Sequence, residues 1–408
     1  MARTEQSFSA GSGSPAAAPA ALRGRGAVTN VRHRFQQTER QASADAVDMF
    51  ADTAPVGLRT EVRAEQARSI LSRNDSPDVP FDVAINPYRG CEHGCVYCFA
   101  RPTHAYLGYS PGLDFETKLV AKANAVDVLR AELSRPGYRV SPINLGSATD
   151  IYQPIERNWR LTRGILQLLL ETGHPVTLVT KNALVERDID LLRVLAERNL
   201  VMAFVSITTL DAEMARTLEP RASAPWRRLQ AVRTLAQAGV PVGVLASPLI
   251  PFINDEFLEA ILEEAANAGA RFSGYTVVRL PWEVKDVFEE WLQAHFPDRA
   301  QRVLHRIEDM REGRRNDPEF GTRMRGTGIW ADLLRQRYTL AVRKYGLNAM
   351  RPQLDCSQFV APQPPARTSG NSASPSAVPV RFHEGGRRVA AAALAVQAQR
   401  AGQLSLFD

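Results

Sequence analysis

The chain has 408 residues, of which 44% are hydrophobic, so it can bury a large core and is long enough for one α/β barrel with tails. It contains no run of about 18 apolar residues, which excludes a membrane-spanning helix. The formal net charge of +6 permits a nucleic-acid partner without requiring one.

The chain begins with a basic segment of low complexity. Residues 1–44 are rich in alanine, glycine, serine and proline, with scattered arginines. Such a segment buries too little apolar surface to offset the entropy of ordering, so we predict a disordered arm. It also lacks the continuous apolar stretch of a signal peptide, and we therefore expect a cytoplasmic protein.

Residues 45–350 are predicted to form one domain with a helical extension at its C-terminal end. They alternate between short apolar runs and helical periodicity, which is typical of a parallel sheet covered by helices. The apolar runs predict strands at 82–86, 143–148, 176–180, 202–208, 242–247 and 272–278. The intervals predict helices at 117–134, 160–172, 183–198, 224–238 and 254–268. Six such units predict an α/β fold, a partial (β/α)6 barrel of the TIM type, with an open sheet of five or six strands as the alternative. In either fold the ligand site lies at the carboxyl ends of the strands.

Three of the four cysteines follow the first predicted strand. Cys91, Cys95 and Cys98 have the spacing Cys-x3-Cys-x2-Cys. So few cysteines, so closely spaced, indicate a metal site and not a disulfide framework. Three thiolates on one loop can hold a [4Fe–4S] cluster and leave one iron open. An open iron can bind S-adenosylmethionine (SAM) and pass an electron to it.

The alternative for these cysteines is a structural zinc site. Zinc needs a fourth ligand and favours paired two-residue spacings. His93 lies between the cysteines, where the loop would have to turn sharply to bring it to the same metal, and Cys356 is far away in the sequence.

The longer segment 85–122, INPYRGCEHGCVYCFARPTHAYLGYSPGLDFETKLVAK, resembles the branch of the radical SAM superfamily that is related to spore photoproduct lyase. The resemblance extends over roughly residues 58–350. It implies a partial barrel of the radical SAM type with a [4Fe–4S] cluster at its open mouth. It also implies cleavage of SAM to a 5′-deoxyadenosyl radical.

The same resemblance implies which residues hold SAM. Tyr97 matches an aromatic residue near the adenine, and Lys181 follows Thr180 as in a Thr-Lys pair whose lysine contacts the SAM carboxylate or ribose. Thr149 ends the second predicted strand and Ser206 ends the fourth, where polar groups approach SAM. The alternative for Thr149, Lys181 and Ser206 is an ordinary polar residue at a strand end.

One departure from the family concerns the hydrogen donor. Spore photoproduct lyase carries a hydrogen-donating cysteine just after its second strand, but residues 146–150 contain none, and Ser147 or Ala148 stands there. Cys356 is the only remaining thiol, so it is the candidate catalytic donor, and the alternative is an incidental cysteine. The departure favours a related reaction on another substrate.

The C-terminal region is predicted to be a linker, residues 351–402 with a possible short helix, followed by a binding tail, residues 403–408. The tail resembles the short peptide with which bacterial proteins dock on the DNA-polymerase sliding clamp. Three apolar side chains would enter a pocket on the clamp and a glutamine would add a hydrogen bond. These residues are Gln403, Leu404, Leu406 and Phe407. The alternative is that the tail packs on its own barrel.

An arginine-rich stretch, residues 302–325, is interrupted by acidic residues. It predicts either a helix that faces phosphates or a surface laced with ion pairs.

Together these features predict a lyase-like radical SAM enzyme that repairs or modifies DNA, with an unidentified electron donor and with the sliding clamp as a partner. One alternative is a radical SAM enzyme that acts on RNA, protein or a small molecule. Another is a non-catalytic zinc or iron–sulfur module that binds nucleic acid.

Overall fold

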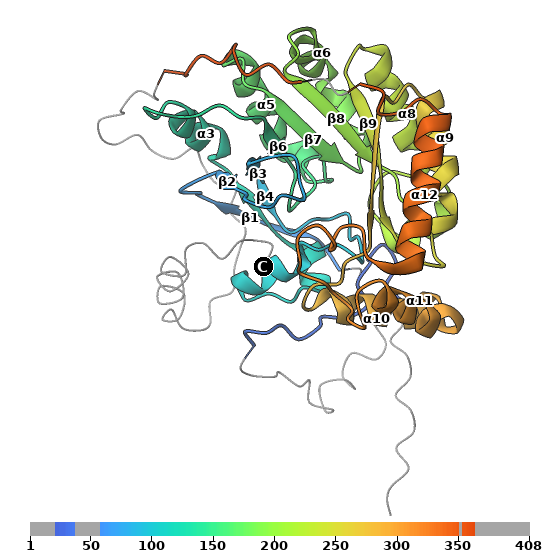
Figure 1. The fold of residues 1–408 in the computed structure, drawn as a ribbon. Coiled ribbons are helices and arrows are strands. Elements are labelled where there is room, and N and C mark those ends of the chain that lie inside the picture. Colours follow the sequence, from blue (N-terminus) through green and yellow to red (C-terminus); the bar gives the residue numbers. More distant parts are fainter. Residues whose placement is uncertain (1–20, 37–57, 351–352, 364–408) are drawn as a thin grey trace, which may run out of the picture.

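The computed structural model describes residues 21–36, 58–350 and 353–363, and its centre is a seven-stranded sheet (Figure 1). The strand order is β10-β9-β8-β7-β6-β3-β2, and every neighbouring pair is parallel except β2 (Leu71–Arg73) with β3. The six parallel strands are those predicted: β3 (Val83–Ile85), β6 (Ile143–Leu145), β7 (Val176–Thr180), β8 (Val201–Ser206), β9 (Val242–Leu249) and β10 (Phe272–Val277). The predicted α/β fold with six parallel strands is confirmed.

Helices between these strands cover the outer face of the sheet (Figure 1). They are α3 (Ala125–Leu133), α5 (Leu161–Glu171), α6 (Ile189–Glu197), α8 (Pro225–Gln237) and α9 (Leu258–Asn267). In α5 the buried residues Ile165, Leu168 and Leu169 recur at the three- and four-residue spacing of one helix face. Short 3-10 helices, η3 (Ala183–Asp188) and η4 (Asp255–Phe257), precede α6 and α9.

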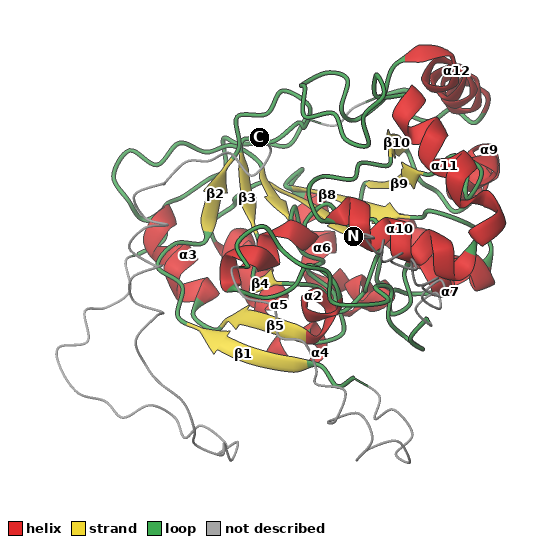
Figure 2. Cartoon of the chain, turned by 90° about the horizontal axis from the view of Figure 1, so that it is seen from below, coloured by secondary structure: helices red, strands yellow, loops and turns green. Residues whose placement is uncertain are grey.

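The prediction of one helix over 117–134 is wrong. The chain there forms α2 (Leu113–Thr117), then strand β5 (Lys118–Lys122), and only then α3. β5 pairs with β1 (Glu61–Glu65) and β4 (Tyr88–Arg89) in a separate three-stranded sheet (Figure 2). The apolar centre of β5 fits a strand or a helix equally well, and pairing with distant segments decided between them.

Further helices lie outside the six predicted strand–helix units and pack beside the cysteine loop. They include α10 (Val284–His295), α11 (Pro297–Asp309) and α7 (Ala212–Leu218). Their apolar faces form a second core with Cys95, Val96 and Tyr97, which is separate from the main core between sheet and outer helices. The remaining helices are η2 (Arg101–Leu107), α4 (Glu156–Trp159) and α12 (Gly328–Lys344).

Residues 21–36 lie against the folded domain, so the prediction of a disordered arm is wrong for this part of it. The backbone amides of Gly26 and Ala27 donate to the carboxylate of Glu116 at 3.0 and 2.8 Å. Arg34 forms an ion pair of 2.8 Å with Glu283. The two buried amide contacts and the half-buried ion pair stabilise this segment, which its composition alone did not indicate. The rest of the predicted arm lies outside the described residues.

Residues 353–363 also lie against the domain, where a linker was predicted. The Gln358 side-chain amide donates to the carbonyl of Arg198, and the Phe359 ring packs on His174 and Tyr138. The remainder of the predicted linker, its possible short helix and the tail 403–408 lie outside the described residues. Among the described residues, no helix is both long and apolar enough to cross a membrane.

Candidate active site

The cysteine loop lies at the carboxyl edge of the parallel sheet, just after β3 and β4. The amide of Cys91 donates to the Phe115 carbonyl, and the amide of Val96 donates to the Leu218 carbonyl. Cys91 and Cys95 are buried and Cys98 is half-buried, and none of the three forms a disulfide. The structure therefore brings the three predicted ligands together on one loop at the edge where the fold places ligands.

A buried ion pair holds the shape of this loop. The Arg101 guanidinium donates to the backbone carbonyls of Gly94 and Cys95, and it lies 2.5 Å from the Glu116 carboxylate. Both charged side chains are fully buried. Arg101 thus uses one planar group to satisfy several carbonyls that a tight loop leaves unpaired.

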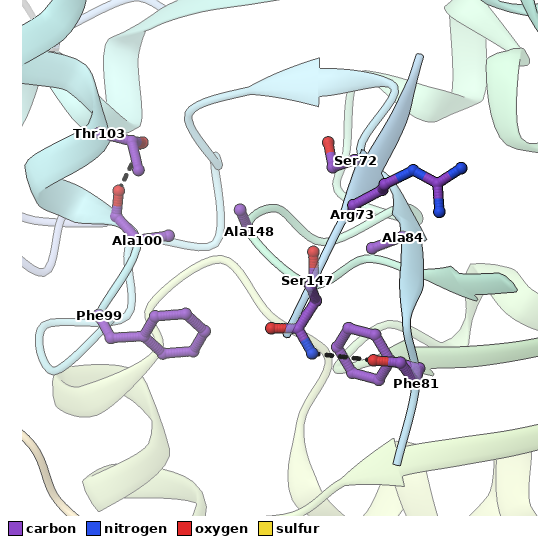
Figure 3. Close-up of a pocket in the computed structure, with 10 residues that line it drawn as sticks. Ser72, Arg73, Phe81, Ala84, Phe99, Ala100, Thr103, Ser147 and Ala148 are labelled. Carbon is purple, nitrogen blue, oxygen red and sulfur yellow. Dashed lines mark hydrogen bonds between the residues drawn. The ribbon is translucent and has the colours of Figure 1, made fainter. Parts of the chain in front are cut away.

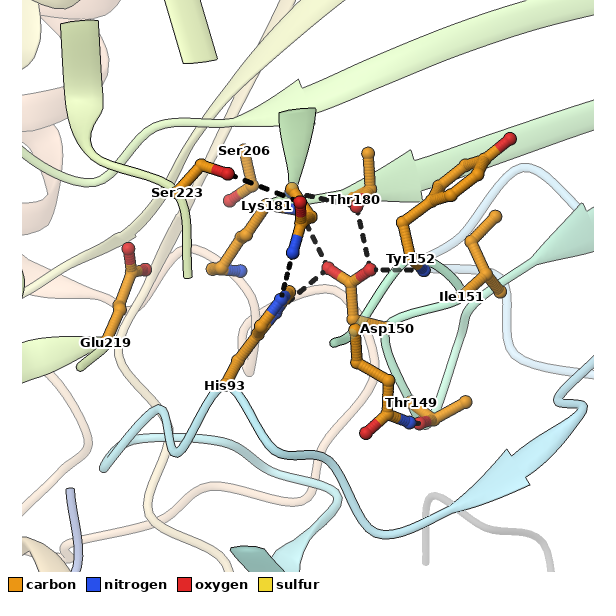
Figure 4. Close-up of polar contacts among 12 residues, drawn as sticks. His93, Thr149, Asp150, Ile151, Tyr152, Thr180, Lys181, Ser206, Glu219 and Ser223 are labelled. Carbon is orange, nitrogen blue, oxygen red and sulfur yellow. Dashed lines mark hydrogen bonds and ion pairs between the residues drawn. The ribbon is translucent and has the colours of Figure 1, made fainter. Parts of the chain in front are cut away.

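A second polar network links the loop to the next strands of the sheet (Figure 4). Asp150 follows β6 and accepts hydrogen bonds from the Thr180 hydroxyl and the Lys181 amide, both at 2.7 Å. Nδ1 of the buried His93 lies 3.3 Å from the Asp150 carboxylate, and its Nε2 lies 3.2 Å from the Asn182 amide nitrogen. Burial alone would raise the pKa of Asp150, but His93 and the hydrogen-bond donors outweigh it and lower it to about 2. Asp150 therefore stays ionised and fixes the ends of two strands beside the loop.

Tyr97 belongs to a third network. Its hydroxyl donates to the buried carboxylate of Glu219, which also accepts from Arg228. Arg228 donates in turn to the Ser206 carbonyl at 3.0 Å, and the Ser206 hydroxyl donates to the Ser247 carbonyl at 3.2 Å. The predicted residues Tyr97 and Ser206 are thus joined through side chains that the sequence analysis did not identify as part of the site.

Lys181 lies between these networks. Its ammonium nitrogen is 5.9 Å from the centroid of the Tyr97 ring. Burial would lower the pKa of Lys181, but the nearby Cys95 and Glu219 outweigh it, so the pKa is raised and the side chain stays charged. A charged amine beside the cysteine loop is suited to binding a carboxylate.

Thr149 lies at the cysteine loop, but its hydroxyl forms hydrogen bonds within the protein. Its hydroxyl donates to the Gly90 carbonyl at 2.7 Å and accepts from the Gln153 amide at 3.0 Å. Gln153 also accepts from the amide of Glu92. These contacts make Thr149 a support for the start of the cysteine loop and leave its hydroxyl little capacity for a ligand.

A small cavity of about 30 Å³ lies beside Phe99 and Ala100, the two residues that follow the third cysteine (Figure 3). It is lined on one side by Phe99 and Ala100, which follow Cys98, and on the other by Ser147 and Ala148, which follow β6. Ala148 is one of the two residues that stand where the related lyase has its cysteine. Ala148 therefore lines the same cavity as the two residues that follow Cys98.

The structure contradicts Cys356 as the catalytic donor. The amide of the preceding Asp355 donates to the carbonyl of Asn199, which comes just before β8 begins. Cys356 is therefore at the amino-terminal end of the strands, whereas the cysteine loop is at their carboxyl end. A strand of six residues spans about 20 Å, so the exposed Cys356 thiol is too far from the loop to return a hydrogen atom there.

The arginine-rich stretch divides between two environments. Arg302 lies 3.9 Å from the centre of the Phe252 ring, Arg306 pairs with Asp309, and Arg315 pairs with Glu289. These contacts match the alternative of an ion-paired surface. Arg311 and Arg323 are instead buried.

The sequence indicated some of the residues that support the site but not others. His93 lies inside the motif and Asp150 follows Thr149, so their positions pointed to the site. Arg101 also lies in the segment that resembles the family, three residues after Cys98, but the sequence did not indicate its buried ion pair. Nothing in the motif points to Glu219, which reaches Tyr97 from 122 residues away in the chain.

The cysteine loop presents three free thiols, the ligand number that suits a [4Fe–4S] cluster with one open iron. Among the residues that the structure describes, no three or more His, Cys, Asp and Glu side chains are grouped to hold one metal ion. In a cluster each thiolate binds a different iron, so the three sulfurs need not converge on one point.

Comparison with known proteins places this geometry in a family. The model of the radical SAM superfamily matches residues 85–265. An uncharacterized protein of Mycobacterium tuberculosis is 35% identical over 307 residues, which cover 72% of this chain and 86% of its own. The chain belongs to the radical SAM superfamily. A second relative of this radical SAM protein, an uncharacterized protein of Methanocaldococcus jannaschii, is 26% identical over 52% of this chain and 76% of its own.

Solved structures of spore photoproduct lyase share the fold of this radical SAM protein. The complex with dinucleoside spore photoproduct has a TM-score of 0.51 and 18% identity, covering 70% of this chain and 80% of the lyase. A mutant lyase with bound AdoMet and the same dinucleoside has a TM-score of 0.50, 18% identity and the same coverage.

Family membership decides several of the predictions. This radical SAM protein is an enzyme, and its superfamily uses a [4Fe–4S] cluster and SAM. The prediction of these two cofactors is confirmed, and the alternative of a non-catalytic zinc module is wrong.

Proposed function

We propose that this radical SAM enzyme repairs or modifies damaged DNA by a reaction related to that of spore photoproduct lyase. The observation that carries the proposal is the fold shared with a spore photoproduct lyase that binds a dinucleoside photoproduct. The basic net charge of the chain is compatible with a DNA substrate.

Cys91, Cys95 and Cys98 hold the [4Fe–4S] cluster in this proposal. The cluster and SAM, when bound, would supply one-electron reduction of the SAM sulfonium and, through it, radical chemistry at a C–H bond of the substrate. The electron comes from a donor protein that is still to be identified.

The residues around the loop bind and orient SAM. Lys181 supplies the charge for the SAM carboxylate, and Ser206 at the end of β8 supplies a hydroxyl oxygen. Tyr97, whose hydroxyl is held by Glu219, presents a fixed ring. Asp150 keeps Lys181 at its position by accepting its backbone amide. A site whose side chains are already held in place loses less entropy when the cofactor binds.

The absence of a cysteine at residues 146–150 supports a substrate or outcome different from that of the lyase. With Cys356 at the other end of the strands, no cysteine outside the cluster motif adjoins the site. A radical SAM reaction on RNA, protein or a small molecule is the alternative that this departure favours.

The test is anaerobic. The protein is reconstituted with iron and sulfide, reduced and given SAM, and 5′-deoxyadenosine is measured with and without UV-irradiated DNA. We expect release that is faster with damaged DNA and is lost in Cys91→Ala, Cys95→Ala and Cys98→Ala, while Cys356→Ala retains it. Release that responds only to RNA or to a protein would favour the alternative.

We also propose that residues 403–408 dock on the sliding clamp and deliver the enzyme to replicating DNA. The double variant Leu406→Ala and Phe407→Ala is expected to lose binding to purified clamp in a pull-down while keeping SAM cleavage. Clamp binding unchanged by this variant would reject the tail as the docking element.

A further inference from the structure

Arg279 is a charged residue at the mouth of the barrel that the site described above does not use. It follows the end of β10 by two residues, at the same edge of the sheet as the cysteine loop. Its guanidinium carbon lies 5.8 Å from the centroid of the Phe99 ring. Phe99 directly follows Cys98, is 41% exposed and lines the small cavity of Figure 3. Arg279 therefore lies beside the residue that directly follows the third cysteine.

The hydrogen-bonding capacity of Arg279 is largely unused. Its one recorded hydrogen bond is a weak contact of 3.6 Å from Nη1 to the Met324 sulfur, and its buried Nε finds no partner among the described residues. Burial, together with the charges of Arg323 and Arg311, lowers the pKa of Arg279 to about 10. A desolvated guanidinium with unmet donors is costly unless an anion binds to it.

Two further arginines stand close enough to influence Arg279. Arg311 is 2% exposed, donates to the backbone carbonyls of Val278 and Arg323, and has a buried Nε without a partner among the described residues. Arg323 is fully buried and pairs with Asp78. Arg311 and Arg323 fix the backbone around Arg279 and add positive charge behind it.

The acidic groups that act on Arg279 are already engaged. They are Asp78, which accepts from Arg323, and Asp317, which accepts from the Thr322 hydroxyl. No ion pair joins Arg279 or Arg311 to a carboxylate in the described part of the chain. The three arginines outnumber the two aspartates, so the cluster has an excess of positive charge.

We propose that Arg279, supported by Arg311 and Arg323, binds a phosphodiester group of the nucleic-acid substrate beside Phe99. The naming of DNA as the source of this group rests on the proposed function. A guanidinium can donate two parallel hydrogen bonds to phosphate oxygens, which suits a partly buried site. Phe99, which is 41% exposed, lies next to it, and an aromatic ring beside a phosphate site suits packing of the attached base. Arg279 would thus bind the phosphate of a nucleotide, and Phe99 would contact its base.

Binding measurements test this without relying on turnover. The reconstituted enzyme is titrated with fluorescent oligodeoxythymidine and with the same oligomer carrying neutral methylphosphonate linkages, at several salt concentrations. The variants are Arg279→Gln, Arg279→Lys and, as the matched control, Arg233→Gln, an exposed arginine on α8. SAM affinity and SAM cleavage without DNA are measured for each variant, and these report whether the fold and the cofactor site are intact.

We expect Arg279→Gln to weaken binding of the natural oligomer roughly tenfold and to lower the slope of log affinity against log salt by about 0.7. Arg279→Lys keeps most of the slope, and Arg233→Gln changes neither quantity. The neutral oligomer binds the wild type and Arg279→Gln equally.

Other results overturn the proposal. Arg279→Gln that binds the natural oligomer like Arg233→Gln rejects the phosphodiester site and leaves the proposed function standing. Loss of SAM affinity in Arg279→Gln, with a far-UV circular dichroism spectrum like that of the wild type, assigns the arginine to the SAM site instead. A wild-type enzyme that binds no oligomer, and whose SAM cleavage does not respond to damaged DNA, rejects the proposed function together with the site.

Discussion

The Arg101–Glu116 pair shows how one residue can decide the geometry of the site. Arg101 caps carbonyls of the cysteine loop, and Glu116 also accepts the amides of Gly26 and Ala27. The pair therefore joins the loop to the N-terminal segment. A buried pair of this kind contributes little net stability, but removing one partner leaves a buried charge uncompensated.

We expect Arg101→Met to lower the free energy of unfolding by about 3–5 kcal/mol and to reduce the iron bound per chain after reconstitution. Urea unfolding and iron analysis measure the two effects. Arg130→Met is the control, because Arg130 pairs with Glu171 at the surface, and its loss is expected to cost less than about 1 kcal/mol. Equal effects of the two substitutions would contradict the structural role of Arg101.

His174 is a buried residue whose charge state depends on pH. Its Nδ1 lies 2.9 Å from the Pro175 carbonyl, its Nε2 lies 2.8 Å from the Tyr138 hydroxyl, and its side chain is fully buried. Burial lowers its pKa to about 4. Between this value and the ordinary pKa of about 6.5, the unfolded chain binds a proton that the native protein does not, so stability falls as the pH is lowered.

From this residue we expect a loss of about 2 kcal/mol of unfolding free energy between pH 7 and pH 5. His174→Gln removes the titrating group, so the unfolding free energy of this variant should change less between pH 7 and pH 5, by about 2 kcal/mol. Urea unfolding of both proteins at the two pH values is the measurement, and the same pH dependence in both would show that His174 does not contribute.

At the scale of elements, the N-terminal segment 21–36 supports the cysteine loop. A Cβ atom on Gly26 would lie 1.8 Å from the backbone oxygen of Gly94, which is inside the cysteine motif. Glycine at this position is therefore required by close approach of two backbones.

We expect Gly26→Ala to detach the segment, because a backbone atom and not a flexible side chain blocks the added methyl group. Limited proteolysis within residues 21–36 should become faster, and the cluster should be lost more readily. Gly24→Ala is the control: it has a φ of +74° with no atom within 4 Å, so it costs only about 1 kcal/mol of backbone strain. A protease-resistant Gly26→Ala protein with a full cluster would refute the contact.

At the scale of the whole molecule, the two largest apolar cores stabilise different parts of the site. The main core fixes the sheet, whereas the second core, centred on the fully buried Trp291 of α10, packs against the cysteine loop. The indole N–H of Trp291 donates to the Thr217 carbonyl at 3.0 Å, which ties α10 to α7. Damage to the second core should therefore reach the cluster before it reaches the sheet.

We expect Trp291→Ala to lower the free energy of unfolding by about 3–5 kcal/mol. It should also separate the loss of the cluster from the unfolding of the chain. In a urea titration, the visible absorbance of the cluster should disappear at a lower concentration than the far-UV circular dichroism of the fold. Leu195→Ala in α6, which belongs to the main core, should shift both signals together. Coincident transitions in Trp291→Ala would show that the two cores unfold as one unit.

The sequence by itself determined the six parallel strands, the position of the cysteine motif after the first of them, and the membership of the chain in its family. These features depend on local pattern: apolar runs of strand length, helical periodicity and the spacing of three thiols. Only the tertiary structure decided that residues 118–122 form a strand, that residues 21–36 are ordered and that Cys356 lies away from the site. It also brought Glu219 to Tyr97, Arg101 to Glu116 and Arg279 to Phe99. The Arg101–Glu116 pair joins residues 15 apart, and the other outcomes depend on contacts between segments far apart in the chain. No local pattern contains the energies of these contacts.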